Sequence, residues 1–358
     1  MVRELVAELA SIPSHEDETE AGDRIEAWLR AETDADVRRD DVGNVVAFRG
    51  EGEYTLALVG HHDVVPPDPE QTDGDGYVVE ARDGRLHGRG TADMKGAVAA
   101  AMVAFRNADP AAELAFASFV GEETGGEGCR AAIDDGFAPD YAVVGEGSTG
   151  YSAPGVTDVA VAHKGRRGST VTATGAAAHA SEPEAGENAI YRATDAVGIT
   201  RELETPRTDV LGHAVEGSVV VTEIDGGSAS NVIPERCSFT VDERTVPGVR
   251  ADLEAVEVVS GVEWTVDQDL PPMACDDSAF ADAVLAAADA AQEGSPEAIV
   301  KPHATDAGWL AQAGTTPVVC GASEPGEAHT ATESVSLAVV ERCADIYRRI
   351  AETDLAEA

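Results

Sequence analysis

Apolar runs of strand length alternate with helix-forming stretches over the first 150 residues of the chain. The pattern predicts strands at Asn44–Phe48, Tyr54–Val59, Leu114–Val120 and Tyr141–Val144. It predicts helices at residues 17–32, 93–108 and 127–134. Because helices and strands alternate, we expect an α/β layer with a mostly parallel central sheet.

The pattern changes near Asp158, where the segments "DVAVAHKG", "STVTATG", "GSVVVTEIDGG" and "CSFTVDER" alternate with a period of two. Two helical stretches, at residues 187–204 and 248–257, lie among them. The α/β pattern then returns with helix 278–291, a turn at 303–313, strand Thr316–Cys320 and a helix over 335–352. We therefore expect an α/β domain (1–157 and 267–358) that is interrupted by an inserted α+β domain (158–266).

Each of four predicted strands is followed by a loop rich in His, Asp or Glu. The loops read "GHHD", "GEETGGEG", "GEGS" and "GASEPGEAHT", and a fifth polar segment, "GRGTADMKG", leads into the helix after residue 93. In open α/β sheets, functional groups gather beyond the carboxyl ends of the strands. These distant segments are therefore expected to converge at one edge of the sheet.

Each loop also has a simpler interpretation when taken alone. His61 suits a polar strand end, Glu122 and Glu123 suit a solvated turn, Asp93 suits a helix N-cap, and His329 suits a surface loop. Their joint placement after strands favours a shared site. Imidazoles and carboxylates without cysteine suit zinc, cobalt or manganese, and one carboxylate can bridge two ions in a hydrolytic centre.

Composition narrows the function classes. The chain has 67 acidic and 25 basic residues, a net charge of −42, so binding to nucleic acid or to an anionic membrane is not expected. We interpret this charge as adaptation to a salty cytoplasm, where salt screens the repulsion, and an acidic mesophilic enzyme is the alternative. The five cysteines form no CxxC pair and are expected to be buried thiols in a reducing compartment. Without a visible signal peptide or apolar span, a cytoplasmic location is expected.

The segments "GHHDVVP", "GRGTADMKG", "GEETGGEG" and "GEGS" resemble those of the dinuclear-zinc aminoacylase and carboxypeptidase family. The similarity covers nearly the whole chain and includes "GRRGS", "AAAHAS", "GENAI", "NVIPERCSFTVDER" and "AHTATE". The resemblance implies a zinc-exopeptidase-like catalytic domain with an inserted ferredoxin-like lid that often forms a homodimer. It implies two divalent ions, with zinc expected first and cobalt or manganese as alternatives.

The resemblance also assigns roles to individual residues. The implied metal ligands are His61, Asp93, Glu123, Glu146 and His329. Asp93 resembles the bridging carboxylate, and Glu146 and His329 resemble ligands of the same metal, opposite the metal of His61. Glu122 resembles the general base, and Asp63 resembles the acid that orients His61. His62 stands where the family usually has an apolar residue and receives no role.

In the inserted domain, His179 resembles a lid histidine that reaches the partner subunit's active site and polarises the scissile carbonyl. Arg166, Asn231 and Arg244 resemble residues that hold the carboxylate and the acyl group of the substrate. A structural salt bridge remains an alternative for each arginine. Thr305 and Asp306 resemble residues of a loop beside the substrate pocket.

The function implied by the resemblance is hydrolysis of the amide bond of an N-acyl amino acid. N-succinyl-LL-2,6-diaminopimelate is the first expectation for the substrate. Alternatives are acetylornithine or acetyl-lysine, lysine or ornithine linked to a carrier protein, and the peptides cleaved by glutamate-type carboxypeptidases. A non-catalytic metal-binding relative is the alternative from a different class.

Overall fold

The computed structural model describes residues 1–74 and 76–356 and divides the chain into two compact units. The larger unit contains Met1–Ala162, Met273–Lys301 and the chain from Thr305 onward. The smaller unit contains His163–Pro272 and Pro302–Ala304. A contiguous stretch in the middle of the chain is thus folded separately from the segments before and after it.

A nine-stranded sheet forms the centre of the larger unit within the described residues. Its order is β1 (Asp36–Arg39), β2 (Val45–Arg49), β8 (Glu113–Phe119), β3 (Thr55–His61), β9 (Tyr141–Val144), β21 (Thr316–Val319), β10 (Val159–His163) and β19 (Met273–Ala274), and β20 (Ala298–Lys301) pairs with β10. The four central strands β8, β3, β9 and β21 are parallel. The pairs β1–β2, β2–β8 and β10–β21 are antiparallel. The prediction of a mostly parallel central sheet is therefore confirmed.

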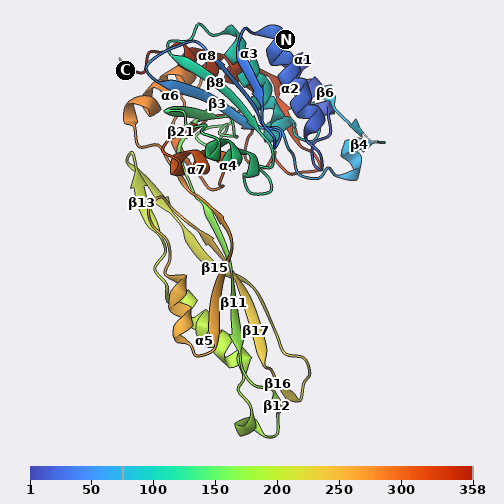
Figure 1. Ribbon diagram of the computed structural model, residues 1–358, viewed down its shortest axis with the longest axis vertical. Coiled ribbons are helices and arrows are strands. Elements are labelled where there is room, and N and C mark those ends of the chain that lie inside the picture. Colours follow the sequence, from blue (N-terminus) through green and yellow to red (C-terminus); the bar gives the residue numbers. More distant parts are fainter. Residues whose placement is uncertain (75, 357–358) are drawn as a thin grey trace. The chain divides into compact units, whose positions relative to one another are not determined.

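The central strands are buried on both faces, which explains why they read as continuous apolar runs. In β3, Leu56 and Leu58 belong to one hydrophobic cluster, and Ala57 and Val59 belong to another. The first cluster contains residues of α1 (Val2–Ser11), α2 (Thr19–Glu32), α3 (Gly96–Asn107), α6 (Ser278–Ala290) and α8 (Leu337–Ala351). The second contains residues of α4 (Glu127–Asp134) and α7 (Asp306–Gln312), and Figure 1 shows the two helical layers.

The larger unit also contains short elements, most of them in the chain between β3 and α3. They are η1 (Pro69–Gln71), β4 (Thr72–Asp73), β5 (Gly76–Tyr77), β6 (Glu80–Arg82), β7 (Arg85–His87), η2 (Thr91–Lys95) and β22 (Ser334–Ser336). Strand β22 pairs antiparallel with β7, with Ser334 opposite His87. This pairing brings a late segment of the chain next to the residues that precede α3.

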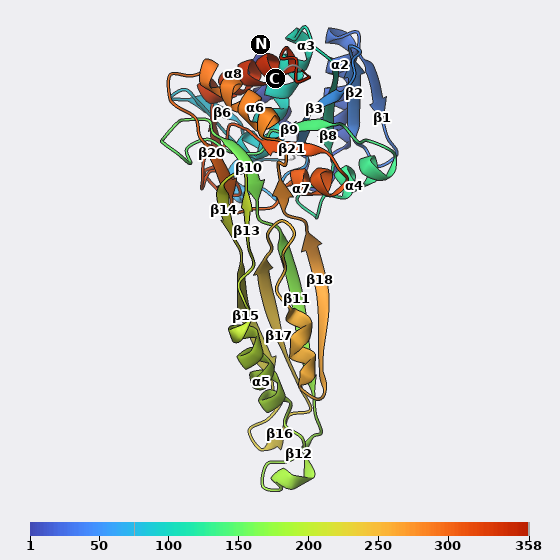
Figure 2. The same cartoon turned by 90° about the vertical axis from the view of Figure 1, so that its left-hand side faces the viewer.

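The smaller unit is an α+β structure. Its four-stranded antiparallel sheet has the order β15 (Ser218–Gly226), β17 (Arg236–Arg244), β11 (Arg166–Thr174) and β18 (Val262–Leu270). Residues of α5 (Ala189–Glu202) and η4 (Leu253–Val258) form one hydrophobic core with this sheet, and Figure 2 shows α5 alongside the strands. The smaller unit also contains two separate two-stranded antiparallel sheets, β12 (Ala178–His179) with β16 (Val232–Ile233) and β13 (Arg207–Val210) with β14 (His213–Glu216).

The structure corrects three of the predicted elements. "DVAVAHKG" was expected in the inserted sheet, but its strand β10 pairs with β21 in the large sheet and is buried at every position. The fourth strand of the small sheet is instead β18, which sequence reasoning missed. The helix predicted at 248–257 is the 3-10 helix η4, and the turn at 303–313 contains α7.

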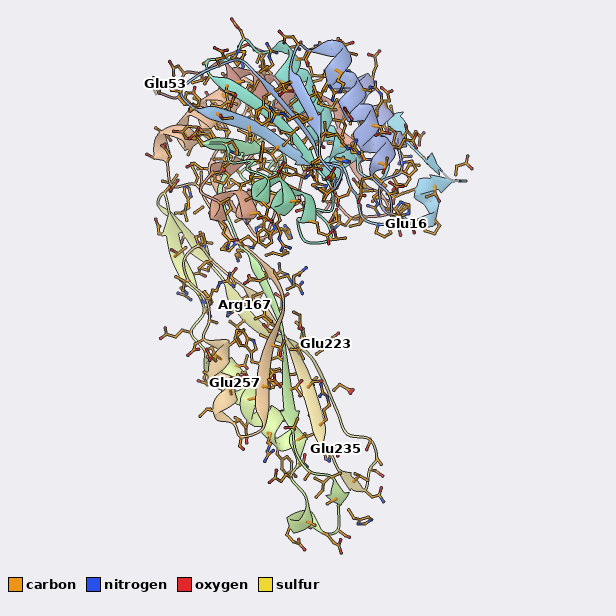
Figure 3. The ribbon with its side chains drawn as sticks, viewed as in Figure 1. Glu16, Glu53, Arg167, Glu223, Glu235 and Glu257 are labelled. Carbon is orange, nitrogen blue, oxygen red and sulfur yellow. The ribbon has the colours of Figure 1, made fainter. Side chains whose placement is uncertain are left out.

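Two predictions from composition can be compared with the structure. All five cysteines are buried and unpaired, which confirms their prediction as buried thiols. None of the helices in the described ranges combines the length and the apolarity needed to cross a lipid bilayer. Exposed acidic side chains lie on both units, as Figure 3 shows for Glu16 and Glu53 on one and Glu223, Glu235 and Glu257 on the other.

Candidate metal centre

The carboxyl ends of the four parallel strands position most of the predicted ligands. His61 is the last residue of β3, and Glu123 and Glu146 lie in the loops that directly follow β8 and β9. His329 lies in the longer loop after β21, and Asp93 lies in η2 just before α3. Because parallel strands end at the same edge of the sheet, residues far apart in sequence meet there.

Asp93 lies between the two histidines. Its Oδ1 is 3.2 Å from His61 Nε2, and its Oδ2 is 3.1 Å from His329 Nε2. Glu146 Oε1 is also 3.2 Å from His61 Nε2, whereas Glu123 Oε1 is 2.8 Å from His329 Nε2. The five side chains thus form two histidine–carboxylate groups that share Asp93.

This grouping differs from the one that the resemblance suggested. Glu146 was expected beside His329, but it lies beside His61 because β9 pairs directly with β3, with Val144 opposite Val59. Glu123 takes the place beside His329. All five predicted ligands come together, with two of them exchanged between the groups.

The donor set fits a pair of divalent cations. Ligand atoms of His61, Glu122 and Glu146 lie within 4.8 Å of one another, and so do those of His61, Asp93 and Glu123. Four carboxylates in so small and largely buried a space repel one another unless positive charge is placed among them. Imidazole nitrogens and carboxylate oxygens are the ligands that zinc and similar ions take in hydrolytic sites.

Asp63 holds both His61 and the loop after β8. His61 Nδ1 lies 3.0 Å from the Asp63 carbonyl oxygen and 3.3 Å from Asp63 Oδ1, while Asp63 Oδ2 accepts a hydrogen bond from the Glu123 N–H at 3.0 Å. A proton on Nδ1 leaves Nε2 free to act as a ligand. Asp63 is therefore placed to orient an imidazole, a common arrangement around metal-binding histidines.

The charges in the centre shift several pKa values. Burial opposes protonation of His61, but Asp63, Asp93 and Glu146 outweigh it and raise its pKa. Hydrogen bonds to Asp93 and Glu123 raise the pKa of His329 to about 10. The carboxylates around both imidazoles therefore favour a positive charge at this position, whether a proton or a bound cation supplies it.

Glu122 differs from the other carboxylates of the centre. Its Oε2 is 4.0 Å from His61 Nε2, farther than the carboxylate oxygens of Asp93 and Glu146. Burial raises the pKa of Glu122 well above its usual range, and the nearby Glu146, Asp306 and Glu123 add to this. A carboxylate that bonds no partner so closely and holds a proton readily suits a role in proton transfer.

His329 has a φ of 59°, in the left-handed region that residues with a side chain rarely adopt. Such conformations cost about 1–3 kcal/mol and occur mainly where the surrounding structure enforces them, often at functional sites. The loop that carries His329 is therefore held in an unfavourable backbone geometry that points its imidazole at Asp93 and Glu123.

His62 is outside this cluster of ligands. It is fully buried, its Nδ1 lies 2.9 Å from Ser118 Oγ, and burial lowers its pKa to about 3. A neutral histidine that bonds a neighbouring strand is a structural residue, and the structure gives it no ligand position.

Of four other buried ionisable residues in the larger unit, sequence reasoning named only Asp306, as a residue of the loop beside the pocket. Lys301 Nζ lies 3.7 Å from Glu146 Oε2, Asp306 is 3% exposed with a pKa that burial raises to about 7, and Arg89 forms a buried ion pair with Glu333. Lys301 is one of only three lysines in the chain, which is the one sequence signal that singles it out.

The predicted substrate-binding residues have other partners in the structure. Thr305 is the N-cap of α7, where its hydroxyl accepts a hydrogen bond from the Ala307 N–H. In the smaller unit, Arg166 and Arg244 both donate to Asp242, at 2.7 and 2.8 Å, which is the salt bridge left open as an alternative. Their role toward a substrate stays a prediction.

His179 and Asn231 lie next to each other in the smaller unit. The exposed His179 has its Nδ1 2.6 Å from Ser181 Oγ, and the Asn231 carbonyl accepts a hydrogen bond from the Ala180 N–H at 2.9 Å. Neither side chain belongs to the ligand cluster, which lies within the larger unit. Their catalytic role also stays a prediction.

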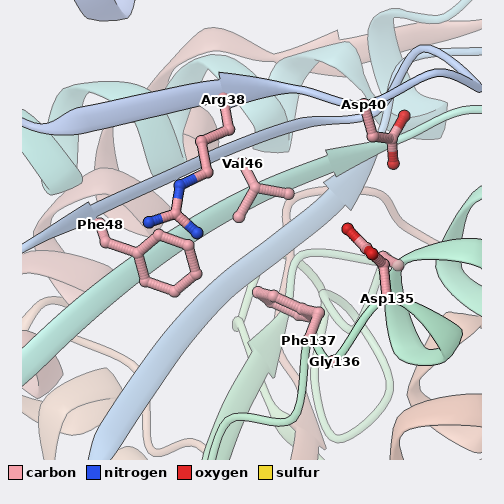
Figure 4. A pocket seen from close by; sticks show the side chains of 8 residues that line it. Arg38, Asp40, Val46, Phe48, Asp135, Gly136 and Phe137 are labelled. Atoms are coloured by element: carbon pink, nitrogen blue, oxygen red, sulfur yellow. The ribbon is translucent and has the colours of Figure 1, made fainter.

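A cavity of about 120 Å³ lies elsewhere on the larger unit, between β1, β2 and the end of α4. Its lining residues are Arg38, Asp40, Val46, Phe48, Ala132, Asp135, Gly136 and Phe137, and Figure 4 shows most of their side chains. The Arg38 guanidinium lies 5.3 Å from the centre of the Phe48 ring and also pairs with Asp36. This cavity contains none of the predicted ligands.

Comparison with solved structures supports the fold. Aminopeptidase PepT from Bacillus cereus has a TM-score of 0.82 at 20% identity, over 98% of this chain and 97% of that chain. A dinuclear metal-binding peptidase of the M20 family from Bacillus subtilis has a TM-score of 0.72 at 16% identity, over 100% of this chain and 98% of that one. At these identities the likeness concerns the fold.

Comparison of sequences gives closer relatives. The chain is 29% identical to a succinyl-diaminopimelate desuccinylase of Bordetella petrii, over 98% of this chain and 96% of the relative. It is 32% identical to an acetylornithine deacetylase of Myxococcus xanthus, over 87% of this chain and 84% of the relative. Residues 57–353 match the profile of peptidase family M20/M25/M40. The match covers most of the chain, so this protein is a metallohydrolase that belongs to peptidase family M20/M25/M40.

Proposed function

We propose that the protein hydrolyses the amide bond of an N-acyl amino acid and that N-succinyl-LL-2,6-diaminopimelate is its substrate. The observation that carries the proposed reaction is the position of Asp93, whose two oxygens face two different histidines at 3.2 and 3.1 Å. A carboxylate in that position suits a bridge between two metal ions. The desuccinylase of Bordetella petrii, which is similar over 98% of this chain, supports the substrate.

His61, Asp93, Glu123, Glu146 and His329 would hold two divalent ions, zinc in the first instance and cobalt or manganese as alternatives. Such ions supply Lewis acidity and lower the pKa of water toward neutrality. Glu122 accepts the proton of the attacking water and returns it to the departing amine. Asp63 keeps the His61 ring oriented while this happens.

Residues outside the ligand set are proposed to hold the substrate. Arg166 and Arg244 suit its carboxylates because a guanidinium donates two parallel hydrogen bonds, and Asn231 and Thr305 suit its polar acyl group. In this proposal the arginines exchange part of their bonding to Asp242 for the substrate. His179 is proposed to stabilise the oxyanion in the active site of a partner subunit.

A homodimer through the smaller unit follows from that role of His179. Strand β15 is at the edge of the small sheet, and its Val220 and Ile224 are 50% and 55% exposed. Tyr191 of α5 is 69% exposed. An unpaired strand edge with exposed apolar side chains is a surface that a second copy can cover. Size-exclusion chromatography with light scattering measures the assembly, and a purely monomeric active enzyme would contradict the proposal.

The acetylornithine deacetylase of Myxococcus xanthus, at 32% identity, supports a second candidate substrate, acetylornithine. Both substrates are amides of an amino acid that retains a free amine. A single panel separates them from the alternatives. The purified protein, loaded with Zn²⁺ or Co²⁺ in concentrated KCl, is assayed on succinyl-diaminopimelate, acetylornithine, acetyl-lysine, a carrier-protein tail ending in lysine, and a glutamyl dipeptide.

The expected result is metal-dependent release of succinate and diaminopimelate with the highest kcat/KM of the panel. Faster hydrolysis of acetylornithine would overturn the substrate and keep the reaction. A protein that binds metal and hydrolyses nothing in the panel would favour a non-catalytic relative. Full activity in protein stripped of metal would overturn the proposed reaction.

A further inference from the structure

A buried ion pair contacts the chain segments that carry the predicted metal ligands. The side chains of Arg89 and Glu333 are 3% and 1% exposed, and Arg89 donates from one terminal nitrogen to Glu333 Oε2 at 2.6 Å. Arg89 lies between β7 and η2, and Glu333 immediately precedes β22. Neither residue is among the predicted ligands. A buried ion pair of this kind is not in itself a source of stability, so its partners need a different explanation.

The second oxygen of Glu333 binds the backbone around Asp93. Glu333 Oε1 accepts hydrogen bonds from the N–H groups of Ala92 and Asp93, at 3.0 and 3.2 Å. Asp93 is the carboxylate that both histidines share. The Glu333 side chain therefore fixes the main chain of the residue on which the two halves of the centre depend.

The same pair connects the other two ligand segments. Arg89 donates from its other terminal nitrogen to the Pro66 carbonyl at 3.2 Å, in the segment that follows His61. Glu333 lies in the same loop as His329, and its carbonyl accepts a hydrogen bond from the Gly88 N–H at 3.1 Å. Three segments that carry ligands thus meet at one ion pair.

We propose that Arg89 and Glu333 are positioning residues that set the place of Asp93 between His61 and His329 and so tune metal binding. The inference rests on the proposed function in one respect, that the centre binds metal. Glu333 holds the main chain at Asp93 in place because both of its oxygens accept hydrogen bonds. One oxygen accepts from the Arg89 guanidinium, and the other accepts from the N–H groups of Ala92 and Asp93.

A glutamine at position 333 has the same shape but only one accepting atom. Its NH₂ group must face either Arg89 or the N–H groups of Ala92 and Asp93, and each of these is a donor. E333Q therefore breaks one side of the arrangement without leaving a cavity. The expected consequence is displacement of Asp93 relative to the histidines.

The smaller unit contains a matched control. Glu243, which is fully buried, accepts from Arg167 Nε at 2.5 Å on one oxygen and from the Ala251 N–H at 2.6 Å on the other. Figure 3 labels Arg167 in that unit, which contains none of the predicted metal ligands. E243Q therefore creates the same conflict between donors at a comparable buried site, away from the ligand set.

The test is a titration of metal-free protein with Co²⁺ in concentrated KCl, followed by visible absorption and by competition with a chelator. Partners that orient metal ligands typically contribute about 10- to 100-fold to metal affinity. E333Q is expected to bind at least one Co²⁺ about 10- to 100-fold more weakly, with a changed absorption band. E243Q is expected to match the wild type in both.

Wild-type affinity and an unchanged absorption band in E333Q would overturn the inference, as would an equal loss in E243Q. If circular dichroism shows that E333Q does not fold, R89K replaces it, because one ammonium cannot bond Glu333 and Pro66 as a guanidinium does. R89K is then expected to weaken Co²⁺ binding at least tenfold, and wild-type binding in R89K would overturn the inference. Wild-type protein that binds no Co²⁺ would overturn the proposed function as well.

Discussion

Replacing Glu122 with glutamine separates two roles that this carboxylate can have. Its Oε2 lies 4.0 Å from His61 Nε2, whereas Asp93 and Glu146 approach the same nitrogen to 3.2 Å. The geometry favours a proton acceptor beside the ligands. However, a ligand atom of Glu122 also lies within 4.8 Å of those of His61 and Glu146, so a role as ligand has to be tested.

The expected magnitude follows from the loss of proton transfer alone. General acid–base catalysis typically contributes about 10²- to 10⁴-fold, or about 2.7 to 5.4 kcal/mol at 1.36 kcal/mol for each factor of ten. Glutamine has almost the volume of glutamate and cannot accept the proton, so E122Q should lower kcat by this factor. Because the five ligands are unchanged, E122Q should keep the metal content of the wild type.

The assay measures kcat, KM and the metal content of the same preparation. Glu127 gives a matched control, because it lies in the segment after β8 and is exposed at the start of α4. E127Q should retain activity close to that of the wild type. A kcat for E122Q within tenfold of the wild type would reject Glu122 as the base. Loss of one metal ion in E122Q would instead identify Glu122 as a ligand.

Three further predictions concern the metal, the packing and the charge. Dialysis against a chelator should abolish hydrolysis, and added Zn²⁺ or Co²⁺ should restore it, as assayed together with metal content. Asn44→Ala should lower the free energy of unfolding by about 2–4 kcal/mol in denaturant titrations at fixed KCl, because it leaves the Gly128 carbonyl and the Val120 N–H buried without their partner. The melting temperature should rise between about 0.1 M and about 1 M KCl. Over that range the Debye length falls from about 10 to about 3 Å, which screens the repulsion within a chain of net charge −42. A constant melting temperature would contradict the interpretation of that charge as adaptation to salt.

The convergence of the predicted ligands at one edge of the sheet could be predicted because the sequence marks both the strands and their ends. Strand β9 has the predicted bounds Tyr141–Val144, and β3 and β8 each differ from their predicted bounds by only one or two residues. Buried parallel strands need apolar residues on both faces, which makes their ends abrupt. The first polar residues after each run were therefore correct candidates for the shared edge of the sheet.

The order of strands across the sheet was not predictable, and the errors follow from it. The pairing of β9 with β3 puts Glu146 beside His61, but nothing in the local sequence states which strand is its neighbour. Strand β10 has the length and composition of a strand in either unit. Only its burial at every position, against the alternating burial of β17, separates a central strand from one with an exposed face.

The Arg89–Glu333 pair was missed for a related reason. Its members are 244 positions apart, and each looks like an ordinary surface charge in a chain with 67 acidic residues. The abundance of acids along the chain also hides the few that are buried. Charge density along the sequence therefore says little about where the functional carboxylates lie.

Burial of lysine is a more selective signal in such a protein. Two of the three lysines are buried, and both lie close to segments that carry predicted ligands. Lys95 follows Asp93 by two residues, and its Nζ donates a hydrogen bond to the Ile12 carbonyl at 2.6 Å. Lys301 Nζ lies 3.7 Å from Glu146 Oε2. A buried ammonium costs several kcal/mol unless nearby anions or acceptors compensate it. The chain has almost no lysine on its surface, and its two buried lysines lie where carboxylates are concentrated in the interior. Among the lysines, burial thus points to the segments that carry the predicted ligands, whereas the buried Arg167 pairs with Glu243 in the smaller unit.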